Sequence, residues 1–221
     1  MSRPVTTYRG GGNVRRTFQE LKRRGAQVLV IGDVPEAVSR RATRRLLGHP
    51  DEERHRVLAL TDSGVDDAAW FPGAHGPDDD GITLVGEREL RGAAAADPAT
   101  EPSRPETTVL RRINAEISEW EPAETPPPAV LRVGVYSLET LLEARGIDAV
   151  RTLTARLTSA VRRVRGIGHY HLPRAPDTDA VAELEPVFDA RLELRHAGTG
   201  PEQRWHLPDR GTTSWVALGE P

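Results

Sequence analysis

The chain contains no cysteine among its 221 residues. Disulfide bonds, a thiolate nucleophile and metal sites with cysteine ligands are therefore excluded. Its longest apolar runs have the length of a β-strand, too short to cross a membrane, and the N-terminus lacks the hydrophobic core of a signal peptide. We expect a cytoplasmic protein that does not associate with membranes.

The chain also lacks a strong excess of charge of either sign. It carries 30 basic and 33 acidic residues, so the formal net charge is -3, and no global signal points to nucleic acid or to an anionic membrane. Lys22 is the single lysine, and every other basic residue is arginine. GC-rich coding favours arginine in this way, and salt-adapted proteins also avoid lysine.

The order of the expected elements indicates one α/β domain. Residues 1–12 end in three glycines and are expected to form a flexible leader, and residues 13–221 form the domain, with mobile loops near 63–81 and 92–106. Strands are expected at 28–31, 56–62, 82–86, 130–138 and 166–172. Helices are expected at 13–25, after the glycine turn as far as Gly48, at 109–120, at 148–164 and near 177. Strands at the C-terminal end are separated by Gly/Pro turns and should be antiparallel. The prediction is a mainly parallel central sheet with antiparallel C-terminal strands.

The stretch GDVPEAVS, residues 32–39, partly matches the phosphate-binding pattern G-x-x-x-x-G-K-[ST]. Gly32 and Ser39 fit, whereas Ala37 replaces the second glycine and Val38 replaces the lysine. Valine carries neither a charge nor a donor for the β and γ phosphates. Asp33 and Glu36 add negative charge where phosphates bind, and Pro35 removes one N–H donor. The alternative is an ordinary strand, turn and helix of a Rossmann-like fold.

The strand RVGVYSL in the second half has the form of a Walker B strand followed by Ser-Leu. Tyr136 stands where that motif has its Mg²⁺-binding aspartate. Together the two stretches resemble the RecA/KaiC-type ATPase domain, in which strands such as VVVDSL occur. With GHYHLP, FDARLELR and QRWHLP, the sequence looks like an uncharacterised haloarchaeal family of RecA/KaiC-like, transducer-like proteins.

This resemblance implies a three-layer RecA-like α/β fold over roughly residues 28–218. In such ATPases an acidic residue after the second strand activates water, and the nearest match here is Asp62. Because both the lysine and the Walker B aspartate are missing, that carboxylate has no phosphate or metal to act on. We expect no bound nucleotide and no metal cofactor at the degenerate site formed by Gly32, Ala37, Val38, Ser39 and Tyr136.

Histidines and aromatic residues offer other candidates. His169 and His171 lie two apart on an expected strand, so both face one side, and a metal would need a third ligand such as His206 or Asp189. Histidines at a strand end more often make structural hydrogen bonds. Trp205 and Trp215 fall in the C-terminal strands, where core packing or an interface explains them.

Two groups of arginines are candidates for an interaction surface. Four lie on the helix after the glycine turn, and they could bind nucleic-acid phosphates, bind an acidic protein, or form a solvated helix face: Arg40, Arg41, Arg44 and Arg45. The stretch VRRVRG, 161–166, has the same alternatives, since arginine is also favoured at a helix C-terminus.

The hypothesis from the sequence is a non-catalytic RecA/KaiC-like pseudo-ATPase that regulates or binds a protein partner, in signalling. Two alternatives remain open. One is a DNA recombination or repair accessory that binds nucleic acid through the arginine-rich helix. The other is an enzyme with a rebuilt site that includes His169, His171 and Asp189.

Overall fold

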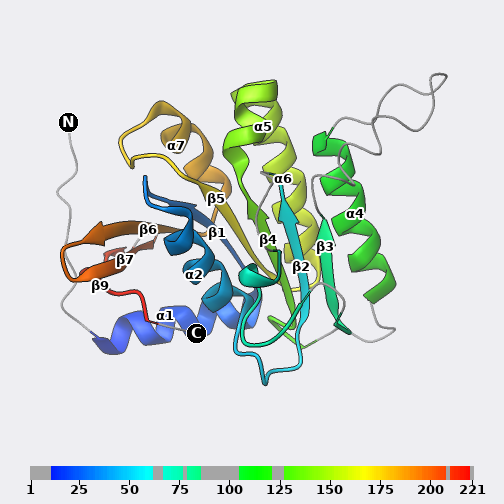
Figure 1. Ribbon diagram of the computed structural model, residues 1–221, viewed down its shortest axis with the longest axis horizontal. Coiled ribbons are helices and arrows are strands. Elements are labelled where there is room, and N and C mark those ends of the chain that lie inside the picture. The colour runs from blue at the N-terminus through cyan, green and yellow to red at the C-terminus, as the bar shows by residue number, and fades with distance from the viewer. Residues whose placement is uncertain are drawn as a thin grey trace.

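A computed structural model describes residues 11–61, 67–76, 79–85, 105–120, 127–207 and 210–219. Its centre is a nine-stranded sheet in the order β3-β2-β4-β5-β1-β6-β7-β8, and β9 also pairs with β7. Figure 1 shows helix α2 in front of this sheet and helix α1 along its lower edge.

Six strands of the sheet run parallel to their neighbours. The parallel strands are β1 (Ala26–Ile31), β2 (His55–Leu60), β3 (Ile82–Val85), β4 (Leu131–Tyr136), β5 (Ile167–Leu172) and β6 (Ala190–Ala197). Strand β6 pairs parallel with β1 on one side and antiparallel with β7 (Gly200–Leu207) on the other. The short strands β8 (Gly211–Thr212) and β9 (Val216–Ala217) pair antiparallel with β7 and complete the C-terminal end.

Helices cover both faces of the sheet and so make three layers. One face packs against α4 (Pro105–Trp120) and α6 (Ile147–Arg163), with α5 (Leu138–Arg145) and α7 (Asp179–Leu184) near the carboxyl ends of the strands. The other face packs against α2 (Glu36–Leu47) and the 3-10 helix η1 (Asp67–Trp70), and α1 (Gly11–Arg24) lies at its edge. A second 3-10 turn, η2 (Glu185–Val187), follows α7.

The alternation of side chains along each strand decides which face each residue joins. In β1, Leu29 and Ile31 belong to the core under α4 and α6, whereas Val28 and Val30 pack under α2. All six residues of β1 are buried, as expected for a strand that is covered on both faces.

The main features predicted from the sequence are confirmed. The fold is α/β in three layers, with a mainly parallel sheet and antiparallel C-terminal strands. The helical spacing of Ile113 and Ile117 correctly placed a helix, and both residues are fully buried in α4. Several boundaries differ by one to four residues; for example, α4 begins at Pro105, β2 ends at Leu60 and β4 ends at Tyr136.

Two parts of the structure were not predicted. Helix α5 lies between β4 and α6, where the sequence analysis expected no element. Within the expected loop at 63–81, Trp70 and Phe71 are each 1% exposed and join the core beneath α2. Residues 62–66, 77–78 and 86–104 lie outside the described residues, and they include a minor part of the expected loop at 63–81 and most of the one at 92–106. So does 1–10 of the expected leader.

Among the described helices, none is both long enough and apolar enough to cross a membrane.

Candidate functional site

The turn after β1 occupies the place of a P-loop, and its glycine is fixed by backbone packing. Gly32 has a φ of +136°, and a Cβ added there would lie 2.3 Å from the Leu194 carbonyl oxygen in β6. Its N–H donates to the carbonyl of Arg174, at 3.0 Å. The close approach of the β6 backbone therefore explains this glycine, and its N–H is already bonded within the protein.

Val38, at the position of the P-loop lysine, is a core residue. Its side chain is 5% exposed and belongs to the cluster formed by Val28, Val30 and Ala42 under α2. The adjacent Ser39, at the Mg²⁺-binding position, is 3% exposed. Of the four P-loop positions, only Ala37 is exposed. The first turn of α2 thus faces the sheet rather than a phosphate.

Two acidic residues lie at the turn and at the start of α2. Asp33 is exposed, and Glu36 forms an ion pair with Arg40, at 3.5 Å. Across the same edge of the sheet, Arg174 binds Glu139 with two nitrogens, the Nε donating at 2.7 Å. Both arginines near the turn are therefore neutralised by a carboxylate of the protein.

Tyr136, at the position of the Walker B aspartate, fills its surroundings with an aromatic ring. It is 9% exposed, and its ring centroid lies 4.3 Å from that of Trp70 and 5.5 Å from that of His171. Thr61 holds Ser137, the residue that follows Tyr136. The Thr61 hydroxyl donates to the Ser137 carbonyl at 2.6 Å and accepts from the Ser137 N–H at 2.9 Å. Asp62, the predicted counterpart of the catalytic acid, lies outside the described residues.

His169 and His171 project from β5 to the α2 side of the sheet, which confirms that they share one face. His171 Nε2 forms a 3.0 Å hydrogen bond with the Thr43 hydroxyl of α2. His169 packs over Gly134, where an added Cβ would lie 2.7 Å from Nε2. Neither ring nitrogen of His169 has a hydrogen-bond partner in the described part of the protein.

Burial shifts the titration of both histidines. Removal from water lowers the pKa of His171 to about 3. Burial, followed by the neighbouring His171 and Arg132, lowers the pKa of His169 well below its ordinary value. Both rings are therefore neutral at physiological pH, because the charged form is disfavoured in a dry environment.

The other proposed ligands lie on the opposite face. Asp189 accepts from the backbone N–H of Gln27 and from Arg162 of α6. His206 bonds to Glu193 and Thr212 on the β6–β8 strands, at 2.7 and 2.9 Å. The rebuilt site of His169, His171 and Asp189 is thus not assembled, and the described residues contain no cluster of three metal-ligating side chains.

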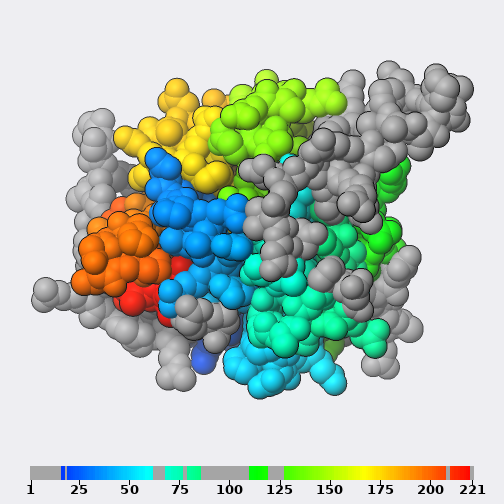
Figure 2. Space-filling view, in the orientation of Figure 1, coloured from blue at the N-terminus to red at the C-terminus, as the bar shows by residue number. Residues whose placement is uncertain are grey.

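The four arginines of α2 are divided between two flanks of the helix. Arg40 binds Glu36 of its own helix, and Arg41 donates to the Gly219 carbonyl at 3.2 Å in the C-terminal segment. Arg44 is half-buried, whereas Arg45 is exposed. In Figure 2 helix α2 forms the middle of the visible face, between the C-terminal strands and the β2–η1 region. Intramolecular contacts therefore engage part of the surface predicted for nucleic acid.

The two tryptophans of the C-terminal strands differ in role. Trp205 packs against the cores beneath α1 and α2. Trp215 carries two guanidinium groups over its ring, those of Arg195 at 4.1 Å and Arg204 at 4.5 Å. The expectation of packing is correct for Trp205, and Trp215 is half-buried by cation–π contacts.

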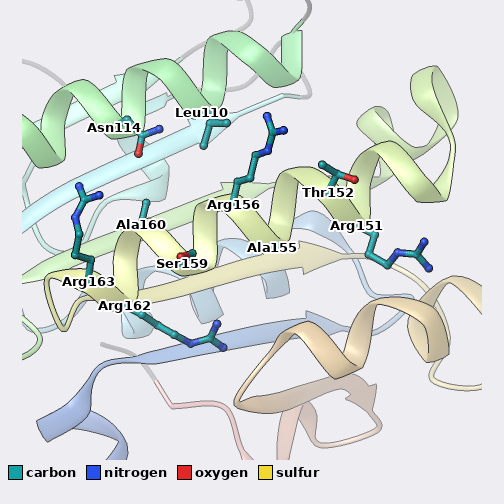
Figure 3. Close-up of a pocket in the computed structure, with 10 residues that line it drawn as sticks. All are labelled: Leu110, Asn114, Arg151, Thr152, Ala155, Arg156, Ser159, Ala160, Arg162 and Arg163. Atoms are coloured by element: carbon teal, nitrogen blue, oxygen red, sulfur yellow. The ribbon is translucent and has the colours of Figure 1, made fainter.

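A large groove of about 1060 Å³ lies between α4 and α6. Figure 3 shows Arg156 and Arg163 of α6 pointing into it, toward Leu110 and Asn114 of α4, while Arg162 points away. In the described structure neither Arg156 nor Arg163 forms an ion pair, whereas Arg151 at the end of the groove pairs with Asp148. The sequence analysis included Arg163 in the stretch VRRVRG but missed Arg156, which lies seven residues earlier on the same side of the helix.

Comparisons with known proteins agree with this geometry. Residues 25–194 match the model of a family of unknown function, DUF7504. The chain belongs to this family. Among solved structures, a KaiC-like protein of the hyperthermophilic archaeon Pyrococcus horikoshii OT3 is similar, with a TM-score of 0.56 over 89% of this chain and 88% of that one. At 11% identity, that similarity establishes a RecA/KaiC-like fold. No curated protein matches the chain.

We predict that Gly32→Ala destabilises the protein even though no ligand is involved. The added methyl group would meet the Leu194 carbonyl in a conformation that favours glycine, and strain of this kind costs about 1–3 kcal/mol. Urea unfolding would measure the difference. Gly198→Ala is the matched control, since a Cβ there meets nothing within 4 Å. Equal stabilities of the two variants would refute the packing explanation for Gly32.

We predict that His171 makes the protein sensitive to acid. The unfolded histidine binds a proton below its ordinary pKa, whereas the folded one resists protonation down to about pH 3, so stability falls as the pH drops through this window. Replacing His171 with Gln should reduce the slope of unfolding free energy against pH by about 1.4 kcal/mol per pH unit between about pH 4.5 and 6.

Thr43→Val is the control for this experiment. It removes the hydroxyl that bonds to His171 but keeps the titrating ring, so it should lower stability and leave the pH slope in place. A His171→Gln variant with the slope of the unmodified protein would contradict the prediction.

Proposed function

We propose that this RecA/KaiC-like domain does not hydrolyse ATP and acts as a regulatory or protein-interaction module in signalling. The observation that carries the proposal is the burial of Val38 and Tyr136 in the core, at the two positions that hold phosphate and Mg²⁺ in the ATPases of this fold. Val38 and Tyr136 pack in the core, so the side chains that stand in place of the lysine and the aspartate also stabilise the fold.

The electrostatics of the turn support this proposal. A triphosphate at the turn would approach Asp33 and Glu36 without a free cation among the described neighbours, because Arg40 and Arg174 are paired with carboxylates. The N–H of Gly32 is also used by the Arg174 carbonyl. Binding would therefore require the loss of existing bonds and the approach of like charges.

The groove between α4 and α6 supports the role in protein interaction. It offers two cations, Arg156 and Arg163, beside the apolar Leu110 and the amide of Asn114. Charge complementarity favours a protein segment that carries acidic side chains and some apolar surface. This groove lies on the face opposite α2, so such a partner would bind away from the former nucleotide position.

Nucleotide binding tests the first half of the proposal. Purified protein would be titrated with fluorescent ATP and Mg²⁺, and released phosphate would be followed in the same samples. We expect no saturable binding of ATP below about 1 mM, which corresponds to a binding free energy weaker than about -4 kcal/mol. We also expect no release of phosphate. Micromolar binding with Mg²⁺-dependent phosphate release would overturn the proposal.

A two-residue variant, Val38→Lys with Tyr136→Asp, sharpens the test. It restores the missing groups but buries two charges in a packed core, and we expect it to be less stable than the unmodified protein without gaining turnover. If this variant folds normally and hydrolyses ATP, the remaining residues of the site can support hydrolysis, and Val38 and Tyr136 alone prevent it in the unmodified protein.

Partner capture tests the second half. Proteins that cross-link to the chain in its native host would be identified, and their affinity would be measured with purified components. We expect Arg156→Glu with Arg163→Glu to weaken binding about tenfold or more, equivalent to about 1.4 kcal/mol. The control is Arg23→Glu with Arg24→Glu on the exposed end of α1. Equal effects of the two pairs would rule out the groove as the binding surface.

A further inference from the structure

A second cavity lies at the opposite edge of the sheet from the glycine turn. Its volume is about 470 Å³, and it is enclosed by α1, the end of α2, and the amino-terminal ends of β1, β4 and β5. This volume falls within the range of pockets that bind small organic molecules. The degenerate nucleotide position is at the carboxyl end of β1, so the two locations are separated by the length of the strand.

The walls of this cavity are largely apolar. They are formed by aliphatic side chains of the sheet and of α2, together with the indole of Trp205: Val28, Ala42, Leu46, Ile167, Leu192 and Trp205. Because these residues belong to β1, α2, β5, β6 and β7, the cavity is built by the packed core rather than by a loop.

One end of the cavity is polar and is defined by Arg132 in β4. This side chain is 5% exposed. Its Nε donates to the Ala129 carbonyl at 2.9 Å, and its Nη1 donates to the Leu46 carbonyl at 3.1 Å. No described residue accepts a hydrogen bond from Nη2, which lies near Gly48 in the cavity lining. A buried guanidinium thus has one nitrogen available to a ligand.

The charges around Arg132 favour an anion. Burial, and then the nearby charges of Arg54 and Arg56, lower the pKa of Arg132 to about 10. Arg132 therefore remains charged at neutral pH. Glu52 is the acidic residue in the described lining of the cavity, and its carboxylate is already bound by Arg54 at 3.0 Å. The guanidinium groups of Arg54, Arg56 and Arg132 therefore lie near the single carboxylate of Glu52. Lys22 and Arg45 add positive charge at the exposed rim of the cavity.

We propose that this cavity binds a small amphipathic carboxylate, with its hydrocarbon or aromatic body against the apolar wall and its carboxylate on Arg132 Nη2. An anion there would satisfy the remaining donor and offset the local excess of positive charge, which is the usual reason for a charge-assisted hydrogen bond. Ligand binding would join α1, α2 and the sheet, since all three contribute to the lining. The proposal is independent of whether ATP binds at the other edge.

The experiment compares three probes of the same chain length on the complete protein: octanoate, octanol and octylamine. Isothermal titration calorimetry would give the affinities, and a change in tryptophan fluorescence that is lost in a Trp205→Phe variant would report contact with the apolar wall. We expect saturable binding of octanoate, binding of octanol at least about tenfold weaker, and no binding of octylamine. Octanol binding as tightly as octanoate, or no saturable binding of octanoate, would overturn the proposal.

Two variants locate the probe. Leu46→Trp fills the cavity from the half-buried end of α2 and should abolish octanoate binding. Arg132→Gln should remove the preference for octanoate over octanol. If Arg132→Gln fails to fold, the comparison of probes on the unmodified protein and the Leu46→Trp variant still decides the question. The control is Arg23→Gln, at an exposed position of α1 outside the cavity lining, and it should leave the affinity unchanged.

Discussion

The apolar contact between α2 and the sheet is the constraint on which the rest of the structure depends. Val38, Ala42 and Leu47 form the buried side of this helix, and they pack over strands that are covered on their other face by α4 and α6. A lysine at position 38 would have to leave this core to reach a phosphate. The valine instead anchors the first turn of α2, so the helix is fixed by packing where ATPases of this fold fix it partly through a ligand.

Several polar side chains are buried between α2 and the sheet, and most of them have hydrogen-bond partners or ring contacts there. His171 forms a hydrogen bond with the Thr43 hydroxyl, the ring of Tyr136 contacts that of Trp70, and Arg132 donates hydrogen bonds to backbone carbonyls. Each neutral ring or bonded guanidinium avoids most of the cost of burial. His169 is the exception, since its two nitrogens have no partner in the described structure, and it is tolerated because the neutral ring packs against Gly134.

The sequence was sufficient to predict the fold because the central strands are short, rich in apolar residues and separated by clear turn residues. The patterns also drew attention to Val38 and Tyr136, and the structure shows that both side chains are buried. Helix α5 was missed because Leu138–Arg145 directly follows a strand and has only a weak apolar stripe. The burial of Trp70 was missed because the surrounding Gly, Pro and Asp residues have the composition of a loop. The opposite orientations of Asp189 and His169 depend on pairing between strands distant in the sequence, which one sequence does not reveal.

The two ends of the parallel strands differ in how completely their polar groups are bonded within the described structure. At the carboxyl edge, where doubly wound sheets usually bind ligands, Gly32, Tyr136 and the Arg174–Glu139 pair complete one another's bonds and contacts. At the amino edge, Arg132 retains an unused donor above an apolar cavity. A donor without an acceptor and an open volume allow a site to gain free energy by binding, and among the described residues Arg132 and the cavity beside it provide both at the amino-terminal ends of the strands. The proposed ligand site therefore does not depend on the turn after β1, because Gly32, Val38 and Tyr136 are not among the residues that line the cavity.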